Sequence, residues 1–160
     1  DSREKPHVPR PYKGQAARRR ERPPGIAFVH IPVPEAFDEP DRDAQGRPLS
    51  LGERKEAHTL LGAQLRRGMF RALVKQRADE KDAAGVRLLV HGHMHNNEDC
   101  RRVQGIWLCF GGGASYAGYG KLGFERRSRV LRIGDWGESI RTWHLYDHDT
   151  QRHVDELELR

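Results

Sequence analysis

Two short apolar segments, each ending at a histidine, restrict the folds open to this chain. One reads LLVHGHMHNN over residues 88–97, and the other reads GIAFVHIPVPE over residues 25–35. A short apolar run bounded by glycine or proline is typical of a buried strand. Parallel strands bring their carboxyl ends to one edge of a sheet, which is where open α/β sheets bind ligands. We therefore expect His30 to lie near His93 and His95, and imidazole is a common metal ligand.

The remaining pattern predicts a mixed α/β chain with one main helix. Five strands are expected, at residues 26–30, 86–90, 106–110, 128–133 and 140–146. A helix is predicted over residues 53–80, because Leu61, Leu65, Met69 and Leu73 recur at four-residue spacing and form one apolar stripe. Gly62 and Gly68 weaken this helix, so two shorter helices are the alternative. The order is strand, helix and then a run of strands, without internal repeats.

Positive charge is concentrated at the start of the chain. Residues 1–24 hold eight Lys or Arg against three Asp or Glu, and five of the nine prolines, whereas all 160 residues carry a net charge of +6. Such a segment buries too little surface to order itself, so we divide the chain into a basic Pro-rich mobile arm at 1–24 and a body at 25–160. Three successive arginines at 18–20 would suit nucleic acid, but the body is nearly neutral, so nucleic acid is not an indicated partner. A membrane is not indicated either, because no apolar run approaches about 18 residues.

The histidine segments match two motifs of a known family. His30 stands in the context FVHIPVPE, and residues 92–95 read GHMH, with Asn97 and Cys100 following. In these residues the chain resembles the calcineurin-like metallophosphoesterases, whose fourth and fifth blocks are a lone His and G-H-x-H. The nearest resemblance is to the small purple-acid-phosphatase-like subgroup of plants, fungi and protists, which continues G-H-D-H-x-N-D-x-C. The chain departs from that pattern by a methionine inside the motif and by Glu98.

This resemblance covers roughly residues 24–158 and implies a fold and an activity. The implied fold class is α/β (α+β), as half of an α-β-β-α metallophosphoesterase sandwich. Two metal ions are implied, drawn from Fe, Zn and Mn, with His30 and His93 on one ion and His95 on the other. The implied reaction is phosphomonoester hydrolysis by a metal-bridged hydroxide, with His93 and His95 at catalytic positions and a phosphate ester as substrate. His91 would pack beside the motif or hold a ligand histidine in place.

Three of the five blocks of that family do not occur in this chain. D-x-H, G-D-x-x-D and G-N-H would supply carboxylate and amide ligands, so we interpret residues 25–160 as the C-terminal half of the domain. The missing N-terminal half is then an expected partner, and the chain alone is expected to be inactive. The composition agrees, because 36% hydrophobic residues and 32% charged residues are polar for a self-sufficient domain. Two alternatives stay open: a catalytically inactive calcineurin-like binding module that uses the basic arm, and an unrelated single-metal His-x-His protein.

A glycine- and tyrosine-rich loop is the next candidate feature. Residues 111–120 read GGGASYAGYG, and these glycines would let backbone N–H groups face a phosphate. The loop is not a P-loop, because Leu122 stands where Ser or Thr is required. By resemblance it lies near the metals, and we expect Tyr116 or Tyr119 to border the substrate. The alternative is a long flexible connection with tight turns.

The remaining polar residues leave several interpretations open. Cys100 and Cys109 are nine residues apart, which does not match the spacing of a C-x-x-C zinc site. A disulfide between neighbouring strands and a pair of buried thiols are both compatible with the sequence, and the compartment therefore stays undetermined. Glu35 would either hydrogen-bond a ligand histidine or serve as a simple loop carboxylate. Four further histidines are expected to be solvated: His58, His144, His148 and His153.

Overall fold

The computed structural model describes residues 23–57, 68–79 and 85–159. Its elements, in chain order, are β1 (Gly25–Val29), η1 (Pro34–Phe37), β2 (Ser50–Leu51), α2 (Gly68–Asp79), β3 (Val86–His91), β4 (Cys100–Val103), β5 (Ile106–Phe110), β6 (Arg127–Gly134), η2 (Asp135–Gly137), β7 (Ser139–Tyr146) and β8 (Asp149–Glu158). Residues 1–22 of the expected arm lie outside the described residues, so the boundary at residue 24 stays a prediction. No helix within the described ranges is long and apolar enough to cross a membrane.

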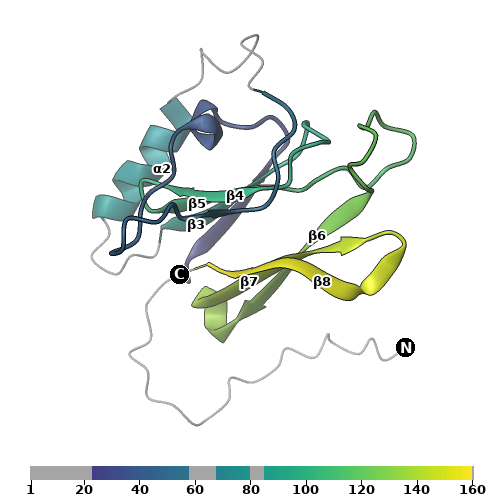
Figure 1. Cartoon of the computed structure of the whole chain (residues 1–160). Helices are drawn as coiled ribbons and strands as arrows, with labels where there is room; N and C mark the ends of the chain where they lie inside the picture. Colours follow the sequence, from purple (N-terminus) through teal and green to yellow (C-terminus); the bar gives the residue numbers. More distant parts are fainter. Residues whose placement is uncertain (1–22, 58–67, 80–84, 160) are drawn as a thin grey trace, which may run out of the picture.

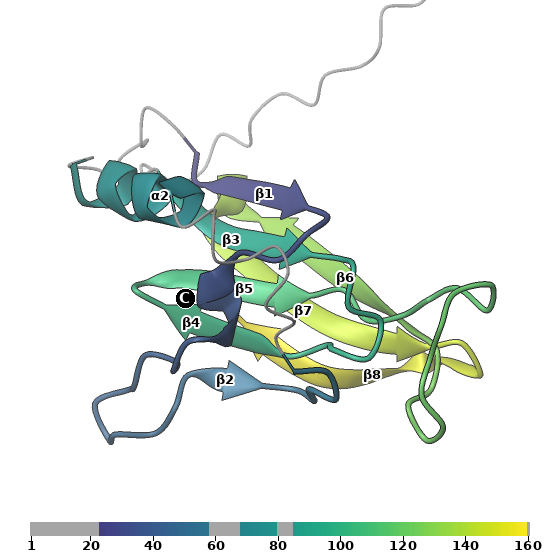
Figure 2. The same cartoon turned by 90° about the horizontal axis from the view of Figure 1, so that it is seen from above.

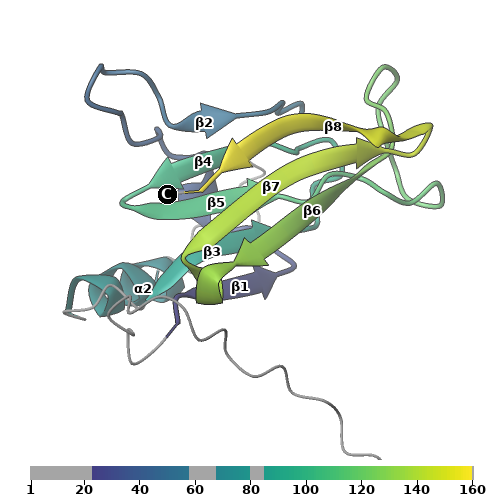
Figure 3. The ribbon, with the colours of Figure 1, turned by 90° about the horizontal axis from the view of Figure 1, so that it is seen from below.

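Two sheets and one helix form three stacked layers. The larger sheet has the strand order β1-β3-β5-β4-β2, in which β1, β3 and β5 are parallel and β4 is antiparallel to its neighbours. The smaller sheet is antiparallel, with the order β6-β7-β8. Helix α2 lies on one side of the larger sheet and the smaller sheet lies on the other (Figure 1), as the view from below also shows (Figure 3). The mixed α/β class is confirmed, and the layers are consistent with part of a metallophosphoesterase sandwich.

Strand β5 joins the two halves of the hydrophobic core. All of its side chains are buried, and successive side chains of a strand point to opposite faces of the sheet. Leu108 and Phe110 pack in the cluster on the helix side. Trp107 and Cys109 pack in the cluster between the two sheets, where they meet Ile140 of β7. A strand covered on both faces is a continuous apolar run, which explains the sequence IWLCF.

Most of the predicted elements are confirmed. The five expected strands correspond to β1, β3, β5, β6 and β7, each within one residue at either end. The helix is confirmed over α2 but is wrong at residues 53–57, where Arg54 forms a β-bridge with Asn97. Residues 58–67 and 80 of that helix lie outside the described residues. The prediction missed β2, which is only two residues long, and it missed β4 and β8, whose charged side chains hide the alternation that marks a strand.

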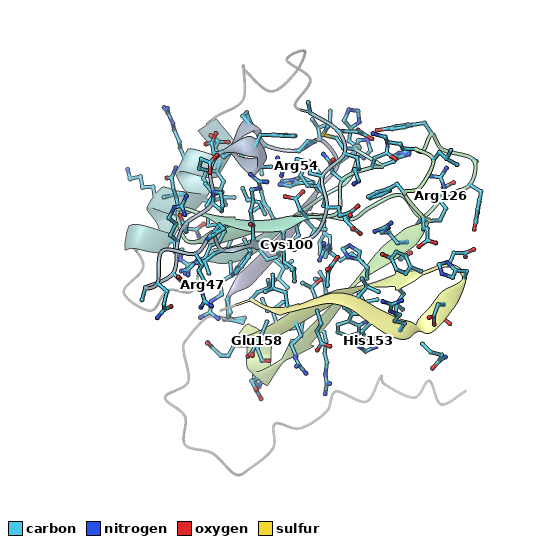
Figure 4. All side chains as sticks on the ribbon, in the orientation of Figure 1. Arg47, Arg54, Cys100, Arg126, His153 and Glu158 are labelled. Atoms are coloured by element: carbon cyan, nitrogen blue, oxygen red, sulfur yellow. A yellow bond between two sulfur atoms is a disulfide. The ribbon has the colours of Figure 1, made fainter. Side chains whose placement is uncertain are left out.

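Cys100 and Cys109 form a disulfide that joins β4 to β5. The two residues lie directly opposite each other in the antiparallel register, with their Cα atoms 4.0 Å apart. Both side chains belong to the cluster between the sheets, and Figure 4 labels Cys100 in this central position. Of the two alternatives that the sequence leaves open, the structure therefore contains the disulfide. Because β4 begins at Cys100, the bond fixes the end of the connection that leads from the GHMH motif to β4.

Candidate metal site

The larger sheet brings His30 and His93 together at one edge. Strands β1 and β3 are adjacent and parallel, and Val29 is paired with His91 at their carboxyl ends. His30 follows β1 directly and His93 follows β3 after one glycine, so both residues lie just beyond the carboxyl ends of their strands, at the same edge of the sheet. Their rings stand edge to face with centroids 5.3 Å apart. Figure 2 shows β1 and β3 ending side by side, with the loop of residues 111–126 beyond them.

The backbone of the motif makes a tight turn at His93. The φ angle of His93 is 68°, a left-handed value that is uncommon for a residue with a side chain. The N–H of Met94 donates to the carbonyl oxygen of Gly92 at 2.8 Å, which closes a three-residue turn around His93. Gly92 permits the close approach of β1, because a methyl group there would lie 3.3 Å from Nδ1 of His30. Such backbone strain is frequent at functional sites, where the surrounding fold must hold it.

His95 is held by the glycine-rich loop rather than by the sheet. Its Nδ1 lies 3.0 Å from the carbonyl oxygen of Tyr119, and the two rings stack with centroids 4.1 Å apart and planes 8° from parallel. The backbone N–H of His95 donates to the Tyr119 hydroxyl at 3.1 Å. The loop must pass close to make these contacts, because a methyl group at Gly118 would lie 2.7 Å from Cε1 of His95.

A second segment, residues 53–57, supports the motif from the other side. The carboxylate of Glu56 accepts hydrogen bonds from the backbone and side-chain amides of Asn96, at 2.9 and 2.6 Å, and from the Tyr119 hydroxyl at 2.9 Å. Buried Asn97 in turn binds the backbone of this segment, through N–H groups of residues 55 and 56 and the carbonyl oxygen of Glu56. These contacts explain why residues 53–57 lie against the motif instead of forming a helix. No local pattern marks Glu56, because its partners Asn96 and Tyr119 are 40 and 63 residues away in sequence.

The two tyrosines of the loop are placed differently. Tyr116 is 73% exposed, and its hydroxyl donates to Asp147 at 2.5 Å, which raises the pKa of Tyr116 above its ordinary value. Tyr119 is 53% exposed, and its hydroxyl accepts a hydrogen bond from the backbone N–H of His95 and donates one to the Glu56 carboxylate. Burial is the main cause that raises the pKa of Tyr119, with the Glu56 carboxylate adding to it. A role for either residue at the substrate stays a prediction.

Two buried polar residues lie close to the histidines in sequence. His91 ends β3 and packs its ring 5.5 Å from that of Phe110. Burial, and then the charge of Arg54, lower the pKa of His91 to about 4, so the ring is neutral near pH 7. Glu35 is buried in η1, and Oε2 of its carboxylate has no hydrogen-bond partner within the described part of the chain. This buried position in a short helix is not that of the simple loop carboxylate that the sequence also allowed, and a hydrogen bond from Glu35 to a ligand histidine stays a prediction.

A second polar cluster lies between the sheets. Ligand atoms of Glu98, His144 and Asp155 all fall within 4.8 Å of one another, the one such group of three among the described residues. Arg127 already forms an ion pair with Glu98 at 2.6 Å, and Arg129 donates to the carbonyl oxygen of Glu98. Two carboxylates are thus balanced by two guanidinium groups, which would repel an entering cation. We interpret the cluster as a buried ionic contact between the sheets.

The prediction that His144 is solvated is wrong, because its ring is fully buried. His144 lies on the same face of β7 as Ile140 and Thr142, an alternation that the sequence already contained. Burial, followed by the charges of Arg129 and Arg127, lowers the pKa of His144 to about 3. Burial also raises the pKa of Glu98, although Arg127 opposes that shift.

The three predicted ligand histidines suit two metal positions better than one. No common group of ligand atoms within 4.8 Å joins His30, His93 and His95 in the described part of the chain. The rings of His30 and His93 meet at the sheet edge, whereas the ring of His95 makes its Nδ1 contact with the glycine-rich loop. Imidazole ligands fit Zn, Fe or Mn. The described residues supply no carboxylate to this group, so further ligands are needed.

Comparison with known proteins agrees with this geometry. The chain is 36% identical over 148 residues to probable inactive purple acid phosphatase 29 of Arabidopsis thaliana, a match that covers 87% of this chain and 33% of the relative. It is 32% identical over 141 residues to probable inactive purple acid phosphatase 14 of the same plant, covering 82% and 32%. It is also 32% identical over 123 residues to phosphatase DCR2 of Saccharomyces cerevisiae, covering 74% and 20%. No family model and no solved structure matches the chain.

These relatives, at 28–36% identity, show that the chain belongs to the calcineurin-like metallophosphoesterase family, and the layered fold and the histidine pair at the sheet edge agree with that family. Within that family, the chain belongs to the purple-acid-phosphatase-like group. The chain spans about a third of the length of the plant relatives. Family membership indicates divalent metal ions.

Proposed function

We propose that this chain supplies three histidine ligands to a metal-dependent phosphoesterase that hydrolyses phosphomonoesters. The observation that carries the proposal is the pairing of His30 and His93, whose rings stand 5.3 Å apart at the ends of two parallel strands. Strands fix such side chains more firmly than a mobile loop would, and metal catalysis requires fixed ligands. The relationship to phosphatases supports the same reaction class.

Each residue has a defined part in the proposal. His30 and His93 would hold one metal ion, and His95 would hold a second through Nε2. When bound, the metals, a pair from Fe, Zn and Mn, neutralise the phosphoryl oxygens and acidify water. The histidines bring no negative charge, so they bind without cancelling the charge that faces the phosphate. Tyr116 or Tyr119, on the loop beside His95, would border the ester.

The remaining ligands would come from an N-terminal half of the domain that carries D-x-H, G-D-x-x-D and G-N-H blocks. That half is the proposed partner of this chain, and the composition supports it, because only 36% of the residues are hydrophobic. A site with three histidines and no carboxylates holds two cations weakly. We therefore expect no measurable hydrolysis by residues 1–160 alone.

A second function is favoured by the relatives themselves. Three plant relatives are named probable inactive purple acid phosphatases, at 28–36% identity. The alternative proposal is a binding module that keeps the fold and its metals but does not turn over esters. Its contact surface would be the basic segment at residues 1–24.

The test uses the full-length native protein from its natural start codon, reconstituted with Fe, Zn or Mn. Hydrolysis of p-nitrophenyl phosphate and metal content by mass spectrometry are measured for the wild type, His93→Ala and His95→Ala. His148→Ala is the matched control, because His148 is exposed in the turn between β7 and β8. We expect both ligand variants to lose metal and at least about 100-fold in kcat/KM, since even residues that only orient ligands cost about 10–100-fold.

Three other outcomes would contradict parts of this proposal. Metal that binds through these histidines without hydrolysis would support the inactive binding module. Activity that survives both substitutions would overturn the proposed site. Turnover by residues 1–160 alone, lost in His93→Ala, would show that the missing half is not needed.

A further inference from the structure

We infer that the loop of residues 113–126 positions His95, and that the carbonyl oxygen of Tyr119 selects the tautomer whose Nε2 is free to bind a cation. The position and tautomer of His95 follow from the hydrogen bonds around it and do not depend on the proposed function, whereas the role of Nε2 in metal binding rests on that function. Tyr119 is in this sense a positioning residue that acts through His95.

The tautomer follows from the hydrogen-bonding capacity of a carbonyl group. Nδ1 of His95 lies 3.0 Å from the Tyr119 carbonyl oxygen, which has no proton to give. The same oxygen accepts a hydrogen bond from the guanidinium of Arg126 at 3.0 Å, so it is already oriented as an acceptor. Nδ1 must therefore carry the proton and donate it. A neutral imidazole carries only one such proton, which leaves the lone pair of Nε2 unprotonated and able to bind a metal.

The Tyr119 side chain fixes the orientation of the same ring. Its ring stacks on the His95 ring with centroids 4.1 Å apart and planes 8° from parallel, which prevents rotation about the Cβ–Cγ bond. Its hydroxyl accepts from the backbone N–H of His95 at 3.1 Å and can donate to the Glu56 carboxylate at 2.9 Å. Tyr119 thus holds His95 at the backbone, at the ring face and at Nδ1.

Glycines allow the loop to come this close. A methyl group at Gly118 would lie 2.7 Å from Cε1 and 2.9 Å from Nδ1 of His95, and one at Gly113 would lie 2.8 Å from its carbonyl oxygen. Arg126 closes the loop by donating to the carbonyl oxygens of Gly118 and Tyr119, both at 3.0 Å, and Figure 4 labels it beside this loop. Two glycines of the loop, Gly113 and Gly118, are therefore explained by contact with His95.

The experiment measures the tautomer directly in the full chain, without metal. Long-range ¹H–¹⁵N correlation spectra at pH 8 distinguish a proton on Nδ1 from one on Nε2 for each assigned histidine. We expect His95 to carry its proton on Nδ1 in the wild type and in Tyr119→Phe, which keeps the carbonyl group and the stacked ring. We expect Gly118→Ala and Tyr119→Ala to shift the ring signals of His95 towards a mixture of tautomers. Gly68→Ala is the matched control, because a methyl group there meets nothing within 4 Å.

Metal binding provides the second measurement. Zn²⁺ titrated into the full chain should shift Nε2 of His95, and Gly118→Ala should weaken this binding by about 10–100-fold, the usual effect of losing a contact that orients a ligand. A proton on Nε2 in the metal-free wild type would overturn the inference. So would an unchanged His95 spectrum and Zn²⁺ affinity in both Gly118→Ala and Tyr119→Ala. A proton on Nδ1 without any effect of Zn²⁺ would uphold the loop geometry but remove the metal role, and only the proposed function would then fail.

Discussion

The buried ring of His144 predicts that the domain loses stability as the pH falls below about 6.5. The groups that face it are Glu98 from the motif segment, Arg127 and Arg129 from β6, and Asp155 from β8. Burial and the two arginines hold the pKa of His144 at about 3 in the folded state, against 6.5 for an ordinary histidine. Between these values the unfolded chain binds a proton that the folded chain does not. The free energy of unfolding therefore decreases as the pH falls through this window.

The magnitude follows from the ordinary pKa alone, provided that folded His144 stays neutral. At pH 5.5 the ring in the unfolded chain is protonated about 10 to 1, which stabilises that state by about RT ln 11, or about 1.4 kcal/mol. At pH 7.5 the same contribution is below about 0.1 kcal/mol. For a domain of this size, the difference corresponds to about 3–6 °C in Tm.

Urea unfolding at pH 7.5 and pH 5.5 tests this prediction in the wild type and in His144→Gln. Glutamine does not titrate, so the wild type should lose about 1.4 kcal/mol more than the variant between the two pH values. The raised pKa of Glu98 acts in the opposite direction, because it favours the folded state at lower pH. Both proteins contain Glu98, and repeating the pair in a Glu98→Gln background removes its titration. A difference below about 0.5 kcal/mol in both backgrounds would refute the reasoning.

Two further predictions concern stability. Replacing Cys100 and Cys109 together by alanine should lower the free energy of unfolding by about 2.7 kcal/mol, from the loop that the bond closes, and a loss below about 1 kcal/mol in urea would contradict this. Arg54→Met should cost about 2–3 kcal/mol, because it leaves the 4%-exposed carboxylate of Asp99 with only one remaining arginine. The control Arg47→Met should cost less than about 0.5 kcal/mol, since that pair lies in solvent, and equal losses in the two variants would be evidence against the argument.

The sequence was sufficient to predict the strands that carry the candidate site. Apolar runs with turn residues at their ends identify β1, β3 and β5, and parallel pairing of β1 with β3 follows from the expected helix between them. His30 and His93 could be predicted as neighbours for the same reason, because each follows the end of a strand.

The supports of the site could not be predicted in this way. Glu56 lies in a segment with helical spacing, and contacts with residues far away in sequence, such as Asn96 and Tyr119, hold that segment against the motif instead. Arg126 likewise has no local pattern that marks its role. His144 is different, because its burial could be predicted from the sequence. It follows Ile140 and Thr142 at two-residue spacing, which places it on the buried face of β7, but its polar neighbours favoured a solvated position.

The segment from Gly92 to Asp99 links two parts of the molecule that are usually altered independently. Its first residues turn at the sheet edge, and its later residue Glu98 joins the smaller sheet through Arg127. A substitution on β6 or β7 that moves Arg127 would therefore also move Glu98, which lies on the same short segment of backbone as His93 and His95. Engineering the packing between the two sheets would, for this reason, also change the positions of His93 and His95.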